Sequence, residues 1–448
     1  MSFLNRMTKR LRWVLPVAAA AVIVGACELD VADPQAIRPG EVEGPAAVPT
    51  AINGVIGDLN NMAEHYVLYS GMFTDEFILA GTFPTRVQVD ERRVLPSNAT
   101  TTGEVNEGLQ TARQQAIKIQ ERFNGLLGDE DFDQSDLRRG ITIGAYVEGL
   151  ALLELGELYC NVRLDPESEG FVGSDAVVEQ ALTQFQEAQS LAEQNAADLS
   201  KNWAQAAMVG QARANLFLGN HDEAASIAAN VDRSHRVLSE HSVNNPNQFN
   251  KVYDLNFGSQ NEVIRWTVGD GTQPERINEK FAEYDDFVSW GIIDAGFCAS
   301  CAFNSSIAVH APLIYDGPAD GIVLSSGKHA RLIEAEAAIR NGQTGTAEDI
   351  INDLRADWPN RWTVQRFGIP GVELDEVELT GNMQDDLLTL MGEYARETWL
   401  TGTRQENLRR LVEEFGAGSA MDLYPEKEGD QICWPVPEQE EVGGSPGD

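Results

Sequence analysis

The 448-residue chain carries 70 acidic and 33 basic residues, which gives it a formal net charge of −37. A protein this acidic repels nucleic acid phosphates and anionic membrane surfaces, so we expect no nucleic acid partner. Its aliphatic and aromatic content is typical of a globular protein with room for two or three domains of ordinary size. The acidic residues are spread along the chain, which indicates a solvated surface and excludes an acidic tail.

Residues 1–26 have the pattern of an export signal. Four basic residues precede the apolar run Val14–Val24, which is too short to span a bilayer comfortably. The run is followed by Gly25-Ala26-Cys27, which resembles a bacterial lipobox, in which small residues precede a cysteine that is diacylated and becomes the new N-terminus. We therefore predict a lipoprotein signal peptide over 1–26 and lipidation of Cys27, whose acyl chains hold the protein on a membrane. The alternative is a plain secretory signal with a coincidental cysteine.

The next segments alternate between irregular and helical patterns. Residues 27–50 are rich in Pro, Gly and Val without a period, which predicts an extended tether. Apolar residues at helical spacing predict a helix over Ala51–Leu68, whereas Phe73–Gly103 contains Gly and Pro breaks and is expected to be irregular. Helices are predicted again over Val105–Leu127 and from the acidic loop Gly128–Asp133 to about residue 159.

The acidic loop does not match a calcium site. Asp129, Asp131 and Asp133 have alternate spacing, but Gln134 stands where an EF-hand needs Gly and Gly140 where it needs Glu. The loop is therefore predicted to be solvated and to precede a helix cap.

The stretch Trp203–Val231 predicts a helical hairpin, and an amphipathic helix over Ser174–Asn195 precedes it. Gly210 and its small neighbours leave the middle of one helix face without bulk, so that another backbone can approach closely. Gly219 supplies a left-handed stop, and Asp222 is expected to cap the second helix.

The hairpin pattern recurs after a shift of 123 positions, from residue 212 to residue 335. Gly219 falls on Gly342 and Ala224 on Ala347, within a second predicted hairpin over His329–Leu354. Small inward-facing residues and a Gly turn resemble a tetratricopeptide unit. The alternative is two unrelated hairpins with similar turn chemistry.

The remaining segments complete the predicted architecture. Residues 234–328 lose the helical period, which predicts short strands and loops with a helix at about Glu275–Phe287. Asn382–Phe415 is strongly helical. We predict a mainly α fold, a tetratricopeptide-like hairpin scaffold over about 105–231 and 329–415, with a loop-rich insertion that carries a few short strands.

Several sequence motifs occur in a characteristic order along nearly the whole mature chain. They are the Leu29–Pro34 start, Tyr146–Leu164, Ala206–Ala224, Arg331–Arg355, Glu393–Arg410 and Trp434–Glu440. Together they resemble the SusD/RagB family of nutrient-binding outer-membrane lipoproteins. In Glu393–Arg410, Thr401 and Asn407 replace usual acidic residues and Gln405 a usual aromatic one, which marks a divergent member. The resemblance implies a single SusD-like domain over 51–448.

No catalytic motif accompanies these features. The chain has no Gly-x-Ser-x-Gly elbow, phosphate loop, dinucleotide fingerprint or His-Glu-x-x-His helix, and no local pair of carboxylates stands out for glycoside hydrolysis. We therefore expect no enzyme activity, no cofactor and no metal site. In an exported protein, the compact pair Cys298 and Cys301 predicts disulfide bonding. The two cysteines could pair with each other, or each could pair with Cys160 or Cys433. A zinc site formed by the four cysteines is the weaker alternative.

The ligand-binding residues are predicted on loops, because the resemblance implies that the helical repeats hold the scaffold. Pyranose CH groups pack on exposed aromatic faces, and carboxylates accept hydrogen bonds from hydroxyl groups. The candidates are Phe83 in the first irregular stretch and Trp266, Tyr284, Asp285, Asp286 and Trp290 in the insertion. For each aromatic residue, core packing is the alternative.

The resemblance implies a lipid-anchored outer-membrane protein, exposed at the cell surface, that captures oligosaccharide or peptide and passes it to a TonB-dependent (SusC-like) transporter. The acidic residues Glu28, Asp30 and Asp33 behind the lipidated cysteine accompany surface export in some outer-membrane lineages. A periplasmic tetratricopeptide-type scaffold without a small ligand and a lipid-anchored hydrolase are the alternatives.

Overall fold

A computed structural model describes the fold of the chain. It covers residues 44–79, 81–165, 170–194, 198–255, 264–265, 293–298, 309–312, 314–315, 317–360, 373–425 and 427–438. The predicted signal peptide, the predicted lipidation site Cys27 and residues 28–43 lie outside this part. The last residues of the predicted extended tether are helical, since Pro45–Ala47 forms a 3-10 turn and the first long helix begins at Val48. The chain divides after Ala47, and Val48–Asp448 forms one compact unit.

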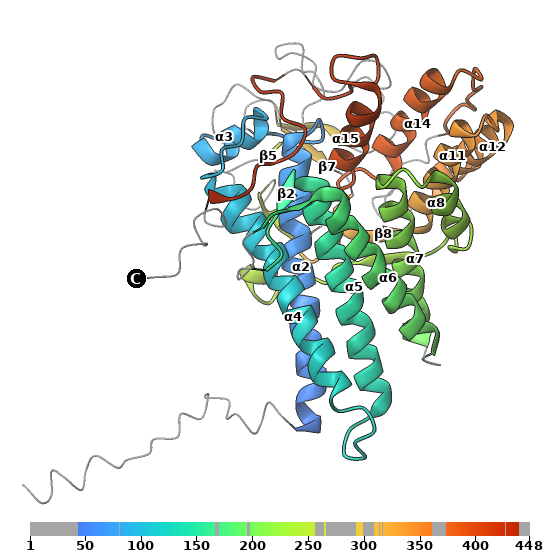
Figure 1. Cartoon of the computed structure of the whole chain (residues 1–448). Helices are drawn as coiled ribbons and strands as arrows, with labels where there is room; N and C mark the ends of the chain where they lie inside the picture. Colours follow the sequence, from blue (N-terminus) through green and yellow to red (C-terminus); the bar gives the residue numbers. More distant parts are fainter. Residues whose placement is uncertain are drawn as a thin grey trace, which may run out of the picture. The chain divides into compact units, whose positions relative to one another are not determined.

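Helices make up most of this unit (Figure 1). They are α2 (Val48–Phe73), α3 (Pro84–Asp90), the π-helical segment η3 (Thr100–Asn106), α4 (Glu107–Asn124), α5 (Gln134–Leu158), α6 (Ser174–Gln194), α7 (Asp198–Phe217), α8 (His221–Ala228), α9 (Lys251–Tyr253), α11 (Gly327–Arg340), α12 (Thr344–Asp357), α14 (Met383–Glu397) and α15 (Arg404–Phe415). Short 3-10 turns lie at Pro45–Ala47 (η2), Pro246–Gln248 (η4) and Trp358–Asn360 (η6).

The strands of the described part are short and form antiparallel pairs. They are β1 (Ile78–Leu79) with β5 (Ile264–Arg265), β2 (Asn161–Val162) with β3 (Val172–Gly173), β4 (Arg236–Leu238) with β8 (Val323–Ser326), and β6 (Ile293–Cys298) with β7 (Val309–Pro312). The predicted mainly α fold with a few short strands in the insertion is confirmed. The helix predicted at Glu275–Phe287 lies outside the described residues.

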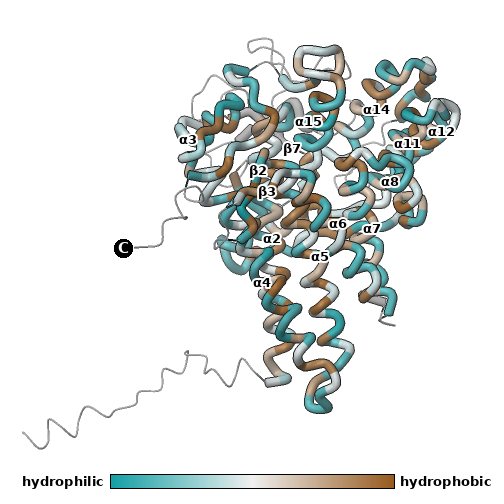
Figure 2. The backbone as a smooth tube through the Cα atoms, viewed as in Figure 1, coloured by the Kyte–Doolittle hydropathy of each residue, from teal (hydrophilic) through white to brown (hydrophobic). Residues whose placement is uncertain are grey.

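Successive helices pack side by side, α4 on α5, α5 on α6 and α6 on α7, while α2 lies against α4 and α5 (Figure 1). Hydrophobic and hydrophilic residues alternate along α4, as expected for a helix with one buried stripe, whereas α5 is buried on all sides from Gly140 to Leu158 (Figure 2). The acidic loop behaves as predicted, because the Asp133 carboxylate accepts from the backbone N–H groups of Ser135 and Asp136 and caps α5.

The small residues of α5 and α7 receive one aromatic ring. A Cβ atom at Gly210 would lie 2.5 Å from the ring of Phe185, and one at Gly149 would lie 3.0 Å from the same ring. The space predicted at Gly210 is therefore filled by a side chain from α6, not by a second backbone. The ring of Phe185 therefore packs α6 against both α5 and α7.

The two predicted hairpins lie next to each other although they are far apart in the sequence. The helix α11 packs on both α7 and α8, and a shared apolar cluster contains Ala212 and Ala224 from the first hairpin and Ile333 from the second. Gly219 and Gly342 have φ values of 76° and 68°, which confirms the left-handed stops.

Three local predictions differ from the structure. Asn220 takes the position before α8 without a side-chain cap, and Asp222 lies in the first turn, where its carboxylate accepts from Asn341. The stretch predicted to be irregular before residue 103 contains α3 and part of η3, because Pro84 suits a first helical turn. The long C-terminal helix is two helices, since the chain turns at Leu400 (φ 56°) and Gly402 (φ 86°).

A disulfide joins Cys160 at the end of α5 to Cys433 near the C-terminus. This pairing rules out Cys160 and Cys433 as partners of Cys298 or Cys301, and it removes the thiolates that a four-cysteine zinc site needs. Strand β6 ends at Cys298, but the side chain of Cys298 and the whole of Cys301 lie outside the described residues. A disulfide between these two cysteines stays a prediction.

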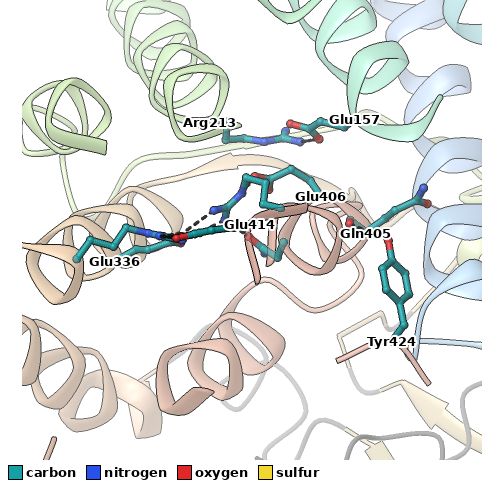
Figure 3. A network of polar contacts seen from close by, with 10 residues as sticks. Glu157, Arg213, Glu336, Gln405, Glu406, Glu414 and Tyr424 are labelled. Carbon is teal, nitrogen blue, oxygen red and sulfur yellow. Dashed lines mark hydrogen bonds and ion pairs between the residues drawn. The ribbon is translucent and has the colours of Figure 1, made fainter. Parts of the chain in front are cut away.

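Buried ion pairs connect the helices in the core (Figure 3). Arg213 of α7 donates to Glu154 (2.9 Å) and Glu157 (2.6 Å) of α5, and Arg410 of α15 donates to Glu336 of α11 at 2.8 Å. Burial raises the pKa values of Glu154 and Glu157. Burial also acts to raise the pKa of Glu336, but Arg410 and Arg340 outweigh it and lower that pKa to about 2. These ion pairs thus join α7 to α5 and α15 to α11.

None of the helices in the described part of the chain is both long and apolar enough to cross a bilayer.

Candidate ligand-binding site

Phe83 lies in the turn between β1 and α3. It has extended backbone angles at the N-cap position, and Pro84 begins the helix behind it. The Phe83 side chain is 44% exposed, whereas most large aromatic side chains of the described part are buried. The position therefore presents an aromatic face to solvent, as the sequence predicts for a ligand-binding residue.

A charged side chain packs on this ring and connects it to further polar groups. The guanidinium of Arg86 lies 5.0 Å from the centre of the Phe83 ring and 5.7 Å from that of Tyr69. Arg86 also pairs with Glu104 at 3.5 Å, and the Tyr69 hydroxyl donates to the same carboxylate. Burial raises the pKa of Tyr69, so its hydroxyl stays protonated and remains a donor. The cluster of Phe83, Arg86, Tyr69 and Glu104 is called the Phe83 platform below.

Hydrogen bonds hold the turn that carries the platform. The Asn98 side chain donates to the carbonyl of Thr85 at 2.8 Å, and its oxygen accepts from the N–H groups of Thr100 and Thr101. The Thr100 hydroxyl donates to that of Thr85 at 2.9 Å. These bonds connect α3 to η3, which also carries Glu104, and so fix the relative positions of the aromatic ring and the carboxylate.

Strand pairing brings the insertion to the same place. In the β1–β5 pair, Arg265 is the partner of Ile78, and Ile78 precedes Phe83 by one short loop. The residue after Arg265 is Trp266, which was predicted to share a site with Phe83. Trp266 itself lies outside the described residues, as do Tyr284, Asp285, Asp286 and Trp290, so these five stay predictions.

Arg86, Tyr69 and Glu104 were not predicted from the sequence. Tyr69 comes from α2 and Glu104 from η3, so only the tertiary fold brings them to Phe83. Arg86 follows Phe83 by three residues on a short helix, and this helical spacing is the one local pattern that could have identified it.

A cavity of about 570 Å³ lies elsewhere, beside α11 and α14. Its walls include Trp358 and Trp399, which are 2% and 5% exposed, and Lys328, which lies 3.5 Å from both Asp357 and Glu397. These tryptophans belong to the apolar core. These two aromatic rings are packed in the core and the lysine is paired, whereas the ring of Phe83 is exposed.

Comparison with solved structures identifies the fold. No protein-family model matches the chain, and no curated protein matches its sequence. A SusD superfamily protein from Bacteroides thetaiotaomicron VPI-5482 is 15% identical, with a TM-score of 0.62 over 89% of this chain and 97% of the other. A SusD superfamily protein from Bacteroides vulgatus ATCC 8482 is 13% identical, with a TM-score of 0.59 over 90% and 97% of the two chains. A SusD-like carbohydrate binding protein from the same strain is 15% identical, with a TM-score of 0.54 over 82% and 83%.

The chain has the SusD fold. The resemblance found in the sequence is thereby confirmed at the level of the fold.

The residues that carry the resemblance hold the SusD fold together. In the segment Glu393–Arg410, Glu393 pairs with Arg355 and with Arg396, while Arg404 donates to both carboxylate oxygens of Asp75. Gly402 faces the ring of Tyr66, where a Cβ atom would lie 2.3 Å away. These contacts explain why the motif is informative about the fold but does not identify the ligand.

Proposed function

We propose that this SusD-fold chain is a cell-surface lipoprotein that captures oligosaccharide and passes it to a TonB-dependent outer-membrane transporter. The observation that carries the proposal is the likeness over most of the chain to SusD superfamily proteins, a carbohydrate-binding one among them. We propose no catalytic step, because capture needs only a difference in affinity between two states of the binding protein.

The Phe83 platform supports the oligosaccharide part of the proposal. A half-exposed phenyl ring offers an apolar face to the CH groups of a pyranose, and Arg86 packs on the ring and holds it in place. Glu104, whose side chain is 36% exposed, offers acceptor atoms to sugar hydroxyls at the edge of the ring. Trp266, Tyr284 and Trp290 of the insertion are proposed to extend this platform, with Asp285 and Asp286 as further hydroxyl acceptors.

The sequence supports the proposed location. The signal over 1–26 and the lipid on Cys27 would anchor the mature chain in the outer membrane, and the residues between Cys27 and α2 would link the anchor to the helical unit. A chain with a net charge of −37 is poorly attracted to anionic lipid headgroups, so the acyl chains would supply the attachment.

The proposal predicts that Phe83→Ala weakens oligosaccharide binding by about tenfold or more, which corresponds to about 1.4 kcal/mol. The measurement is a glycan and peptide array, followed by calorimetric titration, with purified chain that lacks residues 1–27 and retains the compact unit Val48–Asp448.

Phe171→Ala is the matched control. Phe171 is 43% exposed and lies under Arg163, whose guanidinium is 5.1 Å from the ring centre, so it reproduces the surroundings of Phe83 at another place. Equal losses in the two variants would contradict the proposed platform. Binding to peptides alone would favour a peptide-binding protein of the same fold, and binding to neither class would favour a periplasmic scaffold.

A further inference from the structure

A second, smaller pocket shares helix α2 with the Phe83 platform but none of its residues. It has a volume of about 330 Å³, at the lower end of the range for small-molecule sites, and lies between the N-terminal half of α2 and the segment 240–248. Five carboxamide side chains line it: Asn53, Asn60, Asn61, Asn247 and Gln248. No lysine or arginine is among the described residues that line it.

One of the carboxamides builds the pocket, and the others are available to a ligand. The Asn60 side chain donates to the carbonyl of Glu240 at 2.8 Å and accepts from its N–H at 3.0 Å, so it fixes segment 240–248 on α2. Asn61 and Gln248 are exposed. A carboxamide offers both donors and an acceptor, which matches a hydroxyl group that donates and accepts.

The floor of the pocket consists of two buried polar groups. The side chains of Glu64 and His241 are 4% and 2% exposed, and Oε2 of Glu64 lies 3.9 Å from Nδ1 of His241. The Ser239 hydroxyl accepts from the N–H of Ile322, which leaves its proton for Nε2 of His241 at 2.7 Å. The imidazole is thus hydrogen-bonded at Nε2, and Nδ1 lies on the side of the Glu64 carboxyl group.

This floor carries little charge near neutral pH. Burial raises the pKa of Glu64 to about 8, against the opposing effect of Lys251, with Asp254 acting in the same direction as burial. Burial lowers the pKa of His241 to about 4, although Asp320 and a hydrogen bond to Gln248 act in the opposite direction. A protonated carboxyl and a neutral imidazole both form hydrogen bonds with neutral groups, and the pocket holds no cation for an anion.

We propose that this pocket binds a neutral, hydroxyl-rich small molecule of monosaccharide size. The proposal does not rest on the Phe83 platform, because the two places share no residue. Carboxamides on the walls would bond to the hydroxyl groups, and the uncharged floor would complete the set without the desolvation of an unpaired charge.

A glycine in the wall allows the pocket to be filled without damage to the fold. Gly57 lines the pocket on α2, and a Cβ atom there would meet nothing within 4 Å. Gly54 lies one turn earlier on the same helix, is equally open, and does not line the pocket. Leucine has a higher helix propensity than glycine, so Gly57→Leu and Gly54→Leu are both expected to keep the helix.

The test titrates the purified chain from residue 28 onward with glucose, galactose, mannose and xylose, with glucuronate as the charged comparison, and detects binding by calorimetry and saturation-transfer NMR. We expect saturable one-site binding of at least one neutral sugar and weaker binding of glucuronate. Gly57→Leu should weaken that binding by about tenfold or more, whereas Gly54→Leu should leave it unchanged.

The proposal is overturned if none of the neutral sugars binds, if Gly57→Leu binds as well as Gly54→Leu, or if glucuronate binds as tightly as the neutral sugars. Because neither Gly57 nor Gly54 belongs to the Phe83 platform, failure of this test is distinct from failure of the oligosaccharide proposal, which the Phe83→Ala variant tests.

Discussion

At the scale of single residues, buried carboxyl groups explain how the SusD fold depends on pH. Glu76 is 3% exposed, and its Oε1 accepts from the backbone N–H of Leu400 at 2.9 Å. Leu400 has a φ of 56°, so this hydrogen bond supports a turn that leucine rarely adopts. Burial raises the pKa of Glu76 to about 8, and the charge of Asp75 acts in the same direction. The hydrogen bond from Leu400 and the charge of Arg404 act to lower this pKa.

The folded protein therefore binds more protons at Glu76 than the unfolded chain between the ordinary pKa of 4.5 and about 8. Its contribution to the free energy of unfolding is fully present below the lower value and is lost as the pH rises through the higher one. We predict that Glu76→Gln is nearly neutral at about pH 5 and stabilises the protein by at least about 1 kcal/mol at about pH 9, because the amide keeps the acceptor for Leu400 and cannot ionise.

Urea unfolding at the two pH values measures this difference. Glu121→Gln, at an exposed position on α4, is the control and should change stability little at either pH. If Glu76→Gln destabilised the protein, and did so more at about pH 9 than at about pH 5, the raised pKa of Glu76 would be contradicted.

At this scale, the sequence predicted the loop position of Phe83 but did not predict which side chains lie near it. An aromatic residue before Pro84, inside a stretch with Gly and Pro breaks, predicts a loop position, and the ring is indeed exposed. The packing of three elements brings together the other platform residues, which are Arg86, Tyr69 and Glu104. A local sequence period does not predict such contacts between elements. For the same reason, the sequence did not predict that Cys160 pairs with Cys433, because the two residues are 273 positions apart.

At the scale of elements, helical period and glycine stops were sufficient to predict α2, α4 to α8, α11 and α12 with small errors at their ends. The break between α14 and α15 was missed because Leu400 and Gly402 lie inside a continuous amphipathic pattern. The turn there depends on tertiary contacts, with Glu76 on one side and Tyr66 on the other.

Gly210 shows how a small residue in one helix fixes the position of another helix. We predict that Gly210→Ala destabilises the fold by about 1–3 kcal/mol, because the added methyl group would overlap the ring of Phe185, and this outweighs the gain in helix propensity. Chemical denaturation measures the change in the free energy of unfolding.

Gly54→Ala provides the comparison, because a Cβ atom at Gly54 has open space around it on α2. That variant should gain up to about 1 kcal/mol from helix propensity. If both variants were stabilised to the same extent, the packing of Phe185 against Gly210 would be wrong.

At the scale of the whole molecule, the SusD fold joins two hairpins separated by the insertion into one apolar cluster. Buried ion pairs of Arg213 and Arg410 join α7 to α5 and α15 to α11. The turn between β1 and α3 presents Phe83 at the surface of this scaffold. Recognition by such loops, with the helices as a rigid support, is the division of roles that we propose for this protein.

The central claim is that the chain works as the capture protein of an outer-membrane transporter, and purification from native envelopes tests it most directly. Membranes of cells that make the full-length protein are solubilised in mild detergent, the chain is isolated by a C-terminal affinity tag, and partners are identified by mass spectrometry. We expect a TonB-dependent β-barrel to co-purify with the lipidated chain, and less of it with a Cys27→Ser variant. Isolation of the chain with periplasmic assembly proteins, and without any β-barrel transporter, would contradict the account.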